Sequence, residues 1–287
     1  MRSEFNIVTT ALSLILPANN EAAHIQECLN AIMASEPFGD NAAVQIIVVP
    51  NGCSDDTANL ARGFEPQATK RGWRLDVIEL EQGSKLAALN AGEAIAKAPA
   101  LAYLDADVVV SPKLLAETVA ALHNTSPRYA SGTVCISRSK SWITRAYATF
   151  YLQTPFMKQI APGCGYFAMN KAGRARWAKW PAIISDDTFA RLNFAPGERK
   201  QVSARYDWPL VEGLGNLIRV RRRQNAGVDE LEHKFPELLV NDAKTRFAPL
   251  AILKAALRHP IGVFIYGLVA VTVKLVPAKD AAWDRGR

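Results

Sequence analysis

The chain has 287 residues, of which 49% are apolar and 21% are charged, and its formal net charge is +7. This length and composition fit one large globular domain with an appended segment. The basic excess suits an anionic ligand, an anionic membrane surface or nucleic acid. RNA-recognition and helix-turn-helix signatures are absent, and aromatic residues are not interleaved with basic ones, which disfavours nucleic acid. The four cysteines form no C-x-x-C pair, which argues against a zinc site and a disulfide framework.

Apolar runs alternate with helical patterns through the first 125 residues. Strands are expected at 10–16, 44–49, 73–79 and 100–104, and helices at 21–34, 56–62 and 86–97. Pro17 is expected to stop the first strand, and Asn20 to cap the helix that buries Ile25, Leu29 and Ile32. The alternation predicts an α/β fold with a mostly parallel central sheet covered by helices on both faces.

Polar residues follow several of these strands, where open α/β sheets bind their ligands. Asn51 and Asp55 come after the second predicted strand, although Asn-Gly is also a good turn. Gly83-Ser84-Lys85 leads into a helix. A lysine is otherwise unfavourable at a helix start, so Lys85 indicates an anionic ligand such as phosphate. The spacing is not that of a Walker A loop.

Asp105 and Asp107 end the apolar run at 100–104. Because residues two apart in a strand point to the same side, we expect both carboxylates to face one ion or one ligand. Mg²⁺ commonly binds one or two carboxylates together with substrate phosphates. The alternative is a strand-end turn whose aspartates cap a helix that begins at Pro112.

The second half is less regular. A strand is expected at 128–137, an aromatic helix at 142–156, a tight loop at 161–166 and a strand at 199–207. Asp186 and Asp187 begin a short helix, where they could serve as caps without any function. A helix from Pro209 is expected to pass through four arginines at 219–223 and to stop at Gly227. Those arginines form either a solvated face or a phosphate clamp.

From Leu238 the sequence becomes amphipathic and then apolar. The uncharged run at 261–273 is shorter than the roughly 20 residues that span a bilayer. Because Lys244, Arg246, Lys254 and Arg258 precede it, the segment is either an interfacial membrane helix or a helix packed on the domain. No signal peptide is visible at residues 1–10. We therefore expect a cytoplasmic protein, and in the first of these two alternatives the tail would make a peripheral contact to the inner face of the membrane.

Four motifs follow one another in a fixed order. They are P-A-N-N-E at 17–21, V-P-N-G-C-S-D-D-T at 49–57, G-S-K-L-A-A-L-N-A-G at 83–92 and Y-L-D-A-D at 103–107. In this order they resemble the family 2 glycosyltransferases over roughly residues 10–227. The resemblance implies a GT-A fold, a nucleotide-sugar donor of UDP or GDP type, Mn²⁺ or Mg²⁺ as cofactor, and inversion at the anomeric carbon.

The resemblance also implies boundaries for the domains. Residues 1–237 would form the GT-A domain, with a nucleotide-binding half at 10–125 and an acceptor-binding half at 126–237. Residues 238–287 would form an amphipathic C-terminal extension.

The resemblance further implies roles for nucleotide-binding residues. Pro17, Ala18 and Glu21 would border the nucleotide. Asn51 stands where the family usually has an aspartate that contacts the base, which leaves the base open. Positive charge near the diphosphate would come from Lys85, Arg221 and Arg223.

Catalytic, metal and acceptor roles follow in the same way. Asp107 would be the direct metal ligand, and Asp105 would contact the ribose or the metal. Asp187, or in second place Asp186, would be the catalytic base. The acceptor would lie against the loop of Gly163, Cys164, Gly165 and Tyr166.

The implied activity is transfer of a sugar to a saccharide or lipid-linked acceptor in surface polysaccharide or glycolipid synthesis. The Q-x-x-R-W motif of processive synthases is absent. A degenerate nucleotide-sugar-binding or scaffold protein is the non-enzyme alternative. A nucleotidyltransferase ranks lower, because no glycine-rich basic loop follows the first strand. A Rossmann oxidoreductase ranks lower still, because Pro17-Ala18-Asn19 replaces G-x-G-x-x-G.

Overall fold

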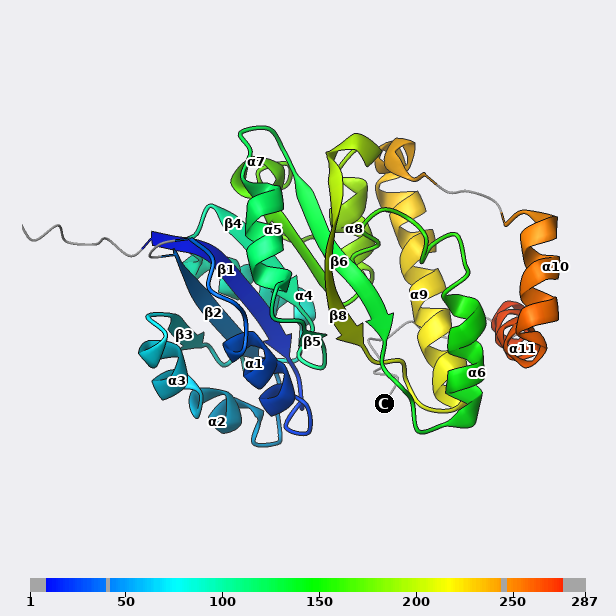
Figure 1. The fold of residues 1–287 in the computed structure, drawn as a ribbon, viewed down its shortest axis with the longest axis horizontal. Coiled ribbons are helices and arrows are strands. Elements are labelled where there is room, and N and C mark those ends of the chain that lie inside the picture. Colours follow the sequence, from blue (N-terminus) through cyan, green and yellow to red (C-terminus); the bar gives the residue numbers. More distant parts are fainter. Residues whose placement is uncertain (1–8, 40–41, 244–246, 276–287) are drawn as a thin grey trace, which may run out of the picture. The chain divides into compact units, whose positions relative to one another are not determined.

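A computed structural model describes residues 9–39, 42–243 and 247–275 (Figure 1). The chain forms two compact units that alternate along the sequence. The first comprises the chain up to Cys135 together with Gly163–Pro181 and Gly197–Trp208. The second comprises Ile136–Pro162, Ala182–Pro196 and the chain from Pro209.

Among the described residues, eight strands form one sheet in the order β3-β2-β1-β4-β7-β6-β8-β5. Their bounds are β1 Thr9–Ala18, β2 Ala42–Pro50, β3 Arg74–Val77, β4 Ala100–Leu104, β5 Val109–Val110, β6 Tyr129–Ile136, β7 Tyr166–Asn170 and β8 Arg199–Trp208. Strands β3, β2, β1 and β4 run parallel, whereas β7 is antiparallel to β4. The predicted α/β fold with a helix-flanked central sheet is confirmed, and its parallel part lies in the first half of the sequence.

The first unit also contains helices, and they pack on both faces of the parallel strands. They are α1 Ile25–Met33, α2 Thr57–Arg62, α3 Glu65–Lys70, α4 Lys85–Ile95, α5 Leu114–Leu122 and α7 Lys171–Arg174. Leu14, Ile46 and Val48 belong to one core cluster with α1 and α5. Alternate side chains point the other way, where Gly92 of α4 lies directly on Ile15 and Val49. Both faces of these strands are therefore buried, which explains their nearly continuous apolar sequences.

Two local predictions in this unit are wrong. Strand β1 continues through Pro17 to Ala18, which pairs with Pro50. Asn20 does not cap α1, whose N-cap residue is His24. Asn20 instead adopts φ 52°, a left-handed conformation that asparagine tolerates better than most residues.

Helices dominate the second unit. They are α6 Trp142–Tyr151, α8 Asp186–Leu192, α9 Leu214–Lys234, α10 Pro249–Arg258 and α11 Pro260–Leu275, followed in α9's case by a short 3₁₀ turn at Pro236–Asn241. Another 3₁₀ turn, Pro196–Glu198, leads into the last segment of the first unit. Gly227 was predicted to end α9, but it lies inside this helix. A Cβ atom at Gly227 would lie 2.2 Å from Ser185 Oγ, so this glycine permits close packing. The helix runs on to Lys234, shortly before Pro236.

The apolar run predicted at 261–273 lies in α11. The side chains of Ile265, Val269 and Val273 are buried, and α11 packs against α6 and α9. The Tyr266 ring lies 5.4 Å from the Tyr147 ring between centroids. In the described ranges, no helix is both long and apolar enough to cross a membrane.

A buried ion pair joins α4 to the segment after β7. Glu93 accepts hydrogen bonds from Arg174 Nε at 2.9 and 2.8 Å, from the Tyr103 hydroxyl at 2.6 Å and from Trp180 Nε1 at 2.6 Å. The side chains of Arg174 and Glu93 are only 12% and 14% exposed. Although burial acts to lower the pKa of Arg174, its contacts with Glu93 raise that pKa overall. The two charges therefore compensate each other inside the unit.

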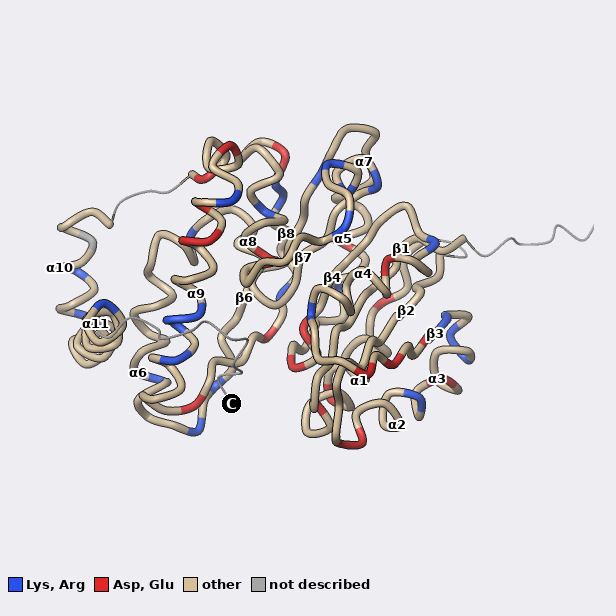
Figure 2. Tube along the Cα trace, turned by 180° about the vertical axis from the view of Figure 1, so that it is seen from behind, with Lys and Arg blue, Asp and Glu red and all other residues tan. Residues whose placement is uncertain are grey.

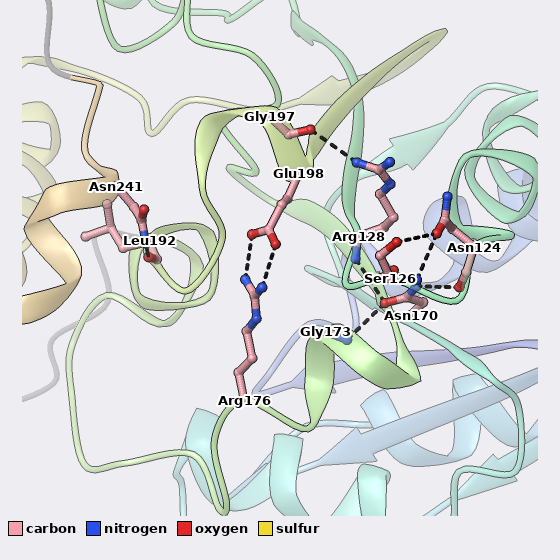
Figure 3. A network of polar contacts seen from close by, with 10 residues as sticks. All are labelled: Asn124, Ser126, Arg128, Asn170, Gly173, Arg176, Leu192, Gly197, Glu198 and Asn241. Atoms are coloured by element: carbon pink, nitrogen blue, oxygen red, sulfur yellow. Dashed lines mark hydrogen bonds and ion pairs between the residues drawn. The ribbon is translucent and has the colours of Figure 1, made fainter.

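A second polar network surrounds Asn170, the last residue of β7 (Figure 3). The Asn170 side chain accepts from the backbone N–H of Arg128 at 3.0 Å and of Gly173 at 2.9 Å. Its amide donates to the carbonyls of Asn124 and Ser126. Arg176 and Glu198 make a two-pronged ion pair nearby, at 2.7 and 2.6 Å. This network fixes the start of α7 relative to β6.

Glu93→Gln is expected to lower the free energy of unfolding by about 3 kcal/mol, because Arg174 would remain buried without a carboxylate. The matched control is Glu198→Gln, whose Arg176 partner is more exposed, and it should cost less than about 1 kcal/mol. Urea unfolding of both variants measures the difference. Equal losses of unfolding free energy in the two variants would show that the buried pair contributes no more to stability than the more exposed pair.

Candidate nucleotide site

Three loops meet at the carboxyl ends of β1, β2 and β3, and the Asn51 side chain joins them. Its amide donates to the carbonyls of Ala18 at 2.9 Å and Val49 at 3.1 Å. Its oxygen accepts from the backbone N–H of Ser84 at 2.9 Å. Asn51 is 1% exposed. One buried side chain thus ties the end of β1 and the loop before α4 to the end of β2.

Hydrogen bonds to backbone carbonyls and a close approach at Gly52 also hold these loops together. The Asn19 amide donates to the carbonyls of Asn51 and Gly52. Gly52 has φ 56°, and a Cβ atom there would lie 2.5 Å from the backbone nitrogen of Gly83. Only glycine fits a left-handed conformation at such a close approach without displacing the neighbouring loop.

Residues 20–22 and 53–57 brace each other in the same way. Asn20 Oδ1 accepts from Ser54 N–H at 2.7 Å, and the Thr57 hydroxyl accepts from Glu21 N–H at 2.8 Å. Asp55 accepts from Ala22 N–H at 3.1 Å and from the Thr57 hydroxyl at 2.6 Å. Burial acts to raise the pKa of Asp55, but these hydrogen bonds outweigh it and lower that pKa. Asp55 is therefore held ionised as an acceptor for this loop pair.

These contacts bear on the nucleotide residues expected at the end of β1. Ala18 is buried, and its carbonyl accepts from both nitrogens of Asn51. Pro17 and Glu21 are half-buried. The amide and oxygen of Asn51 are occupied by backbone groups, which argues against direct contact between this side chain and a base. A structural role for Asn51 was not predicted, although the Asn-Gly dipeptide marked the turn.

Lys85 and Asp105 form an ion pair, with 2.9 Å between Nζ and Oδ1. Lys85 is the first residue of α4, and the Ser84 hydroxyl caps this helix by accepting from Ala87 N–H. Both charged side chains are part-exposed, at 29% and 36%. The carboxylate explains how a lysine is tolerated at a helix start without any ligand. The pair nevertheless stands where solvent, and therefore an anion, can reach it.

The prediction that Asp105 and Asp107 share one side of a strand is wrong in its geometry. Strand β4 ends at Leu104, and Val108 N–H donates to the Asp105 carbonyl at 3.1 Å, which closes a tight turn. Asp105 and Asp107 are both half-buried, whereas Ala106 is buried. The Asp105 N–H donates to the Gly165 carbonyl at 2.9 Å. The turn therefore leaves both aspartates partly accessible while its central residue, Ala106, is buried.

The carboxylates of this turn suit a hard divalent cation. Oxygen ligands are the ones that Mg²⁺ and Mn²⁺ prefer. Within the described residues no group of three or more His, Cys, Asp or Glu could hold a metal ion by itself. Asp105 and Asp107 could thus supply part of a coordination shell, and phosphate oxygens of a ligand would have to supply more. That is the usual arrangement for Mg²⁺ bound with a phosphate.

The loop expected to touch the acceptor is largely buried in the first unit. Cys164 is 3% exposed and Tyr166 is fully buried, with its hydroxyl donating to Thr118 Oγ1 at 2.9 Å. Gly163 and Gly165 have φ 81° and 75°. A Cβ atom at Gly165 would lie 2.7 Å from the Trp208 ring. These residues support the Asp105 turn, and the burial of Cys164 and Tyr166 argues against direct acceptor contact by their side chains.

In the second unit, Asp186 and Asp187 begin α8 but differ in exposure. Asp186 is 5% exposed, whereas Asp187 is half-buried and accepts from Thr188 N–H at 2.6 Å. A general base must reach the proton it removes. Asp187 therefore meets this requirement better than Asp186.

Helix α9 carries several basic positions (Figure 2), and its arginines differ in their contacts. Arg221 Nη2 lies 3.5 Å from the Tyr266 hydroxyl of α11. Burial acts to lower the pKa of Arg221, but Tyr266, Tyr147 and Tyr151 raise it overall. This contact argues against a phosphate role for Arg221. Arg223 is half-buried on the same helix, and the buried Nε of Arg222 has no hydrogen-bond partner in the part of the chain that the structure describes.

The family model described as "Glycosyl transferase family 2" matches residues 13–184, more than half of the chain. The chain belongs to glycosyl transferase family 2. Among named relatives, glycosyltransferase AglE of Haloferax volcanii is 33% identical over 124 residues. That match spans 43% of this chain and only 39% of the relative.

Solved structures show the fold of this family 2 chain. Mannosyltransferase PcManGT from Pyrobaculum calidifontis, in complex with GDP-Man and Mn²⁺, superimposes with a TM-score of 0.61 at 18% identity, over 94% of this chain and 76% of that one. S. aureus TarS 1–349 in complex with UDP-GlcNAc gives a TM-score of 0.50 at 13% identity, over 96% and 95% of the two chains. The predicted GT-A fold is therefore confirmed.

Asn51→Asp is expected to lower the free energy of unfolding of this family 2 protein by about 2–3 kcal/mol. A carboxylate would face the Ala18 and Val49 carbonyls, and two donors would be lost. Chemical unfolding measures the change. The control is Asn30→Asp on the exposed face of α1, which should have little effect. Unchanged stability of Asn51→Asp would contradict the structural role.

Proposed function

We propose that this chain is a metal-dependent, inverting glycosyltransferase that moves a sugar from a nucleoside diphosphate to an acceptor hydroxyl. The observation that carries the proposal is the Lys85–Asp105 ion pair beside the Asp107 turn, at the carboxyl ends of parallel strands. Ligands of open α/β sheets bind at these strand ends. Membership of family 2 supports the same reaction class.

The donor is proposed to lie against the loops that Asn51 joins. The segment at 17–21 would border the nucleotide, while Asn51 would hold the loops in place without touching the base. Lys85 would place its positive charge near the diphosphate. Arg223 and the unsatisfied Nε of Arg222 would add positive charge from α9.

Asp107 is proposed to ligate Mn²⁺ or Mg²⁺, with Asp105 as a second ligand or as a contact to the ribose. The bound cation would neutralise the charge that grows on the diphosphate as the sugar–phosphate bond breaks. Lys85 keeps Asp105 oriented through the 2.9 Å ion pair, so the carboxylate is already positioned before the donor arrives. PcManGT, with the same fold, was solved with GDP-Man and Mn²⁺, which supports this choice of cofactor.

Asp187 is proposed to remove the proton from the acceptor hydroxyl. The resulting oxygen attacks the anomeric carbon opposite the departing phosphate, so a new glycosidic bond forms with inverted configuration. The nucleoside diphosphate leaves with the electron pair of the broken bond. The acceptor is proposed to be a saccharide or a lipid-linked saccharide in surface polysaccharide or glycolipid synthesis.

A nucleotide-sugar-binding protein without turnover is the alternative. Such a protein would need the Asp107 turn for donor binding, but it would not need Asp187. The half-buried position of Asp187 at the start of α8 favours the enzyme.

Asp107→Asn is expected to abolish metal-dependent hydrolysis of the donor and to weaken donor binding in Mn²⁺ by at least about tenfold, because a direct ligand loses its charge. Hydrolysis is followed by release of the nucleoside diphosphate. The control is Glu65→Gln, an exposed carboxylate of α3. Full activity of Asp107→Asn would overturn the assignment.

Asp187→Asn is expected to leave donor binding within about twofold while transfer falls by about 10²–10⁴-fold, since a general base contributes on that scale. Calorimetry measures the binding, and product formation measures the transfer. Thr188→Val tests whether the neighbouring hydroxyl matters, and it should retain most activity. If Asp187→Asn weakened donor binding as much as transfer, the residue would have a structural or binding role instead.

A further inference from the structure

Helices α10 and α11 expose large apolar side chains on the surface of the second unit. On α11 these side chains are Ile261, Phe264, Leu268, Val271 and Leu275, with exposed fractions between 39% and 76%. Their spacing of three and four residues places them along one stripe of the helix.

The opposite stripe of α11 is the one that holds the helix in place. Gly262, Ile265, Val269 and Val273 are buried, and a Cβ atom at Gly262 would lie 2.4 Å from Thr149 Oγ1 of α6. The exposed stripe is therefore not the face by which α11 packs on the rest of the unit. It is a second apolar face on a helix that is already packed.

Helix α10 repeats the pattern with charge beside it. Leu250, Leu253 and Leu257 are exposed by 63%, 56% and 78% at the same spacing. Lys254 and Arg258, each one residue after an exposed leucine, are also exposed. A leucine stripe bordered by basic side chains is typical of helices that lie in the interface of a membrane.

The sequence around both helices carries one sign of charge only. Between Asp242 and Asp280 it contains no acidic residue. Figure 2 shows basic segments and no acidic segment on α10 and α11. Lys274 adds a further exposed cation in the last turn of α11. Lys244 and Arg246, which contributed to the sequence prediction, lie outside the described residues.

We propose that α10 and α11 form a docking surface for the headgroup region of an anionic phospholipid bilayer. The docking surface is defined by Leu250, Leu253, Leu257, Phe264, Leu268 and Val271. The apolar side chains would enter the interface while Lys254, Arg258 and Lys274 contact lipid phosphates. Each basic residue near such a surface adds attraction, and buried apolar area adds the rest.

Charge favours lipid over a second copy of the chain as the occupant. Two copies joined through this surface would bring cations against cations, with no acidic residue of α10 or α11 to compensate. An anionic bilayer complements the same charges. The inference is independent of the proposed reaction, because it uses neither the Asp107 turn nor Asp187.

The first test is co-sedimentation of the full chain with vesicles of phosphatidylcholine alone and with about 30% phosphatidylglycerol, at low and high salt. Binding is expected to the anionic vesicles and to weaken with salt, because surface charges are screened. Phe264→Asp combined with Leu268→Asp should lower the partition coefficient by about tenfold or more. The matched control is Val240→Asp with Ile160→Asp, two exposed apolar residues of the second unit outside the docking surface.

A second pair of variants keeps the apolar stripes intact. Lys254→Glu with Arg258→Glu should lower anionic vesicle binding by about tenfold. Lys171→Glu with Lys179→Glu changes the net charge equally on exposed positions of the first unit and should lower it much less. Circular dichroism confirms that each variant is folded.

Three results would overturn the proposal. One is absence of binding to anionic vesicles at low salt. Another is an equal loss in the docking-surface variants and their controls. The third is a dimer, seen by sedimentation, that Phe264→Asp with Leu268→Asp dissociates while vesicle binding is absent, since a second copy would then be the occupant.

Discussion

The buried Asn51 side chain is the constraint on which the candidate site depends. Its bonds to Ala18, Val49 and Ser84 join the loops after β1, β2 and β3 through one buried side chain. A carboxylate could accept from Ser84 but could not donate to two carbonyls. The amide is therefore chemically suited to joining the loops. Asn51 thus has a structural role at the position where the family resemblance implies a contact to the base.

The charged groups nearest these loops are arranged before any ligand is present. Lys85 and Asp105 hold each other at the end of β4, and the Gly165 carbonyl fixes the turn that carries Asp107. Such preorganisation lowers the cost of assembling a charged site around a diphosphate. The G-C-G-Y loop contributes through the backbone, which explains why its side chains are buried.

Much of the fold could be predicted from local pattern. The runs that became β1, β2 and β4 are almost wholly apolar, as strands buried on both faces must be. Lys85 could be predicted at a helix start and Asp105 at a strand end. Their direct pairing could not, because it depends on how α4 and β4 meet in the fold. The strand end at Leu104 was predicted, but the Asp105–Val108 turn was only the alternative, because the apolar residues that follow Asp107 also suit a strand that continues through both aspartates. The close packing of Gly227 on Ser185 and the contact of Arg221 with Tyr266 could not be predicted, because the two residues of each pair lie far apart in the sequence.

The measurement that tests the central claim most directly is donor binding by calorimetry. A panel of UDP- and GDP-sugars would be titrated into the unmodified full chain with Mn²⁺, with Mg²⁺ and with a chelator. The account predicts that one class of donor binds, and that the chelator weakens its binding by at least about tenfold, because Asp107 would hold a cation that supports the diphosphate. Binding that is unaffected by the chelator, or no binding to any donor by the folded chain, would contradict it.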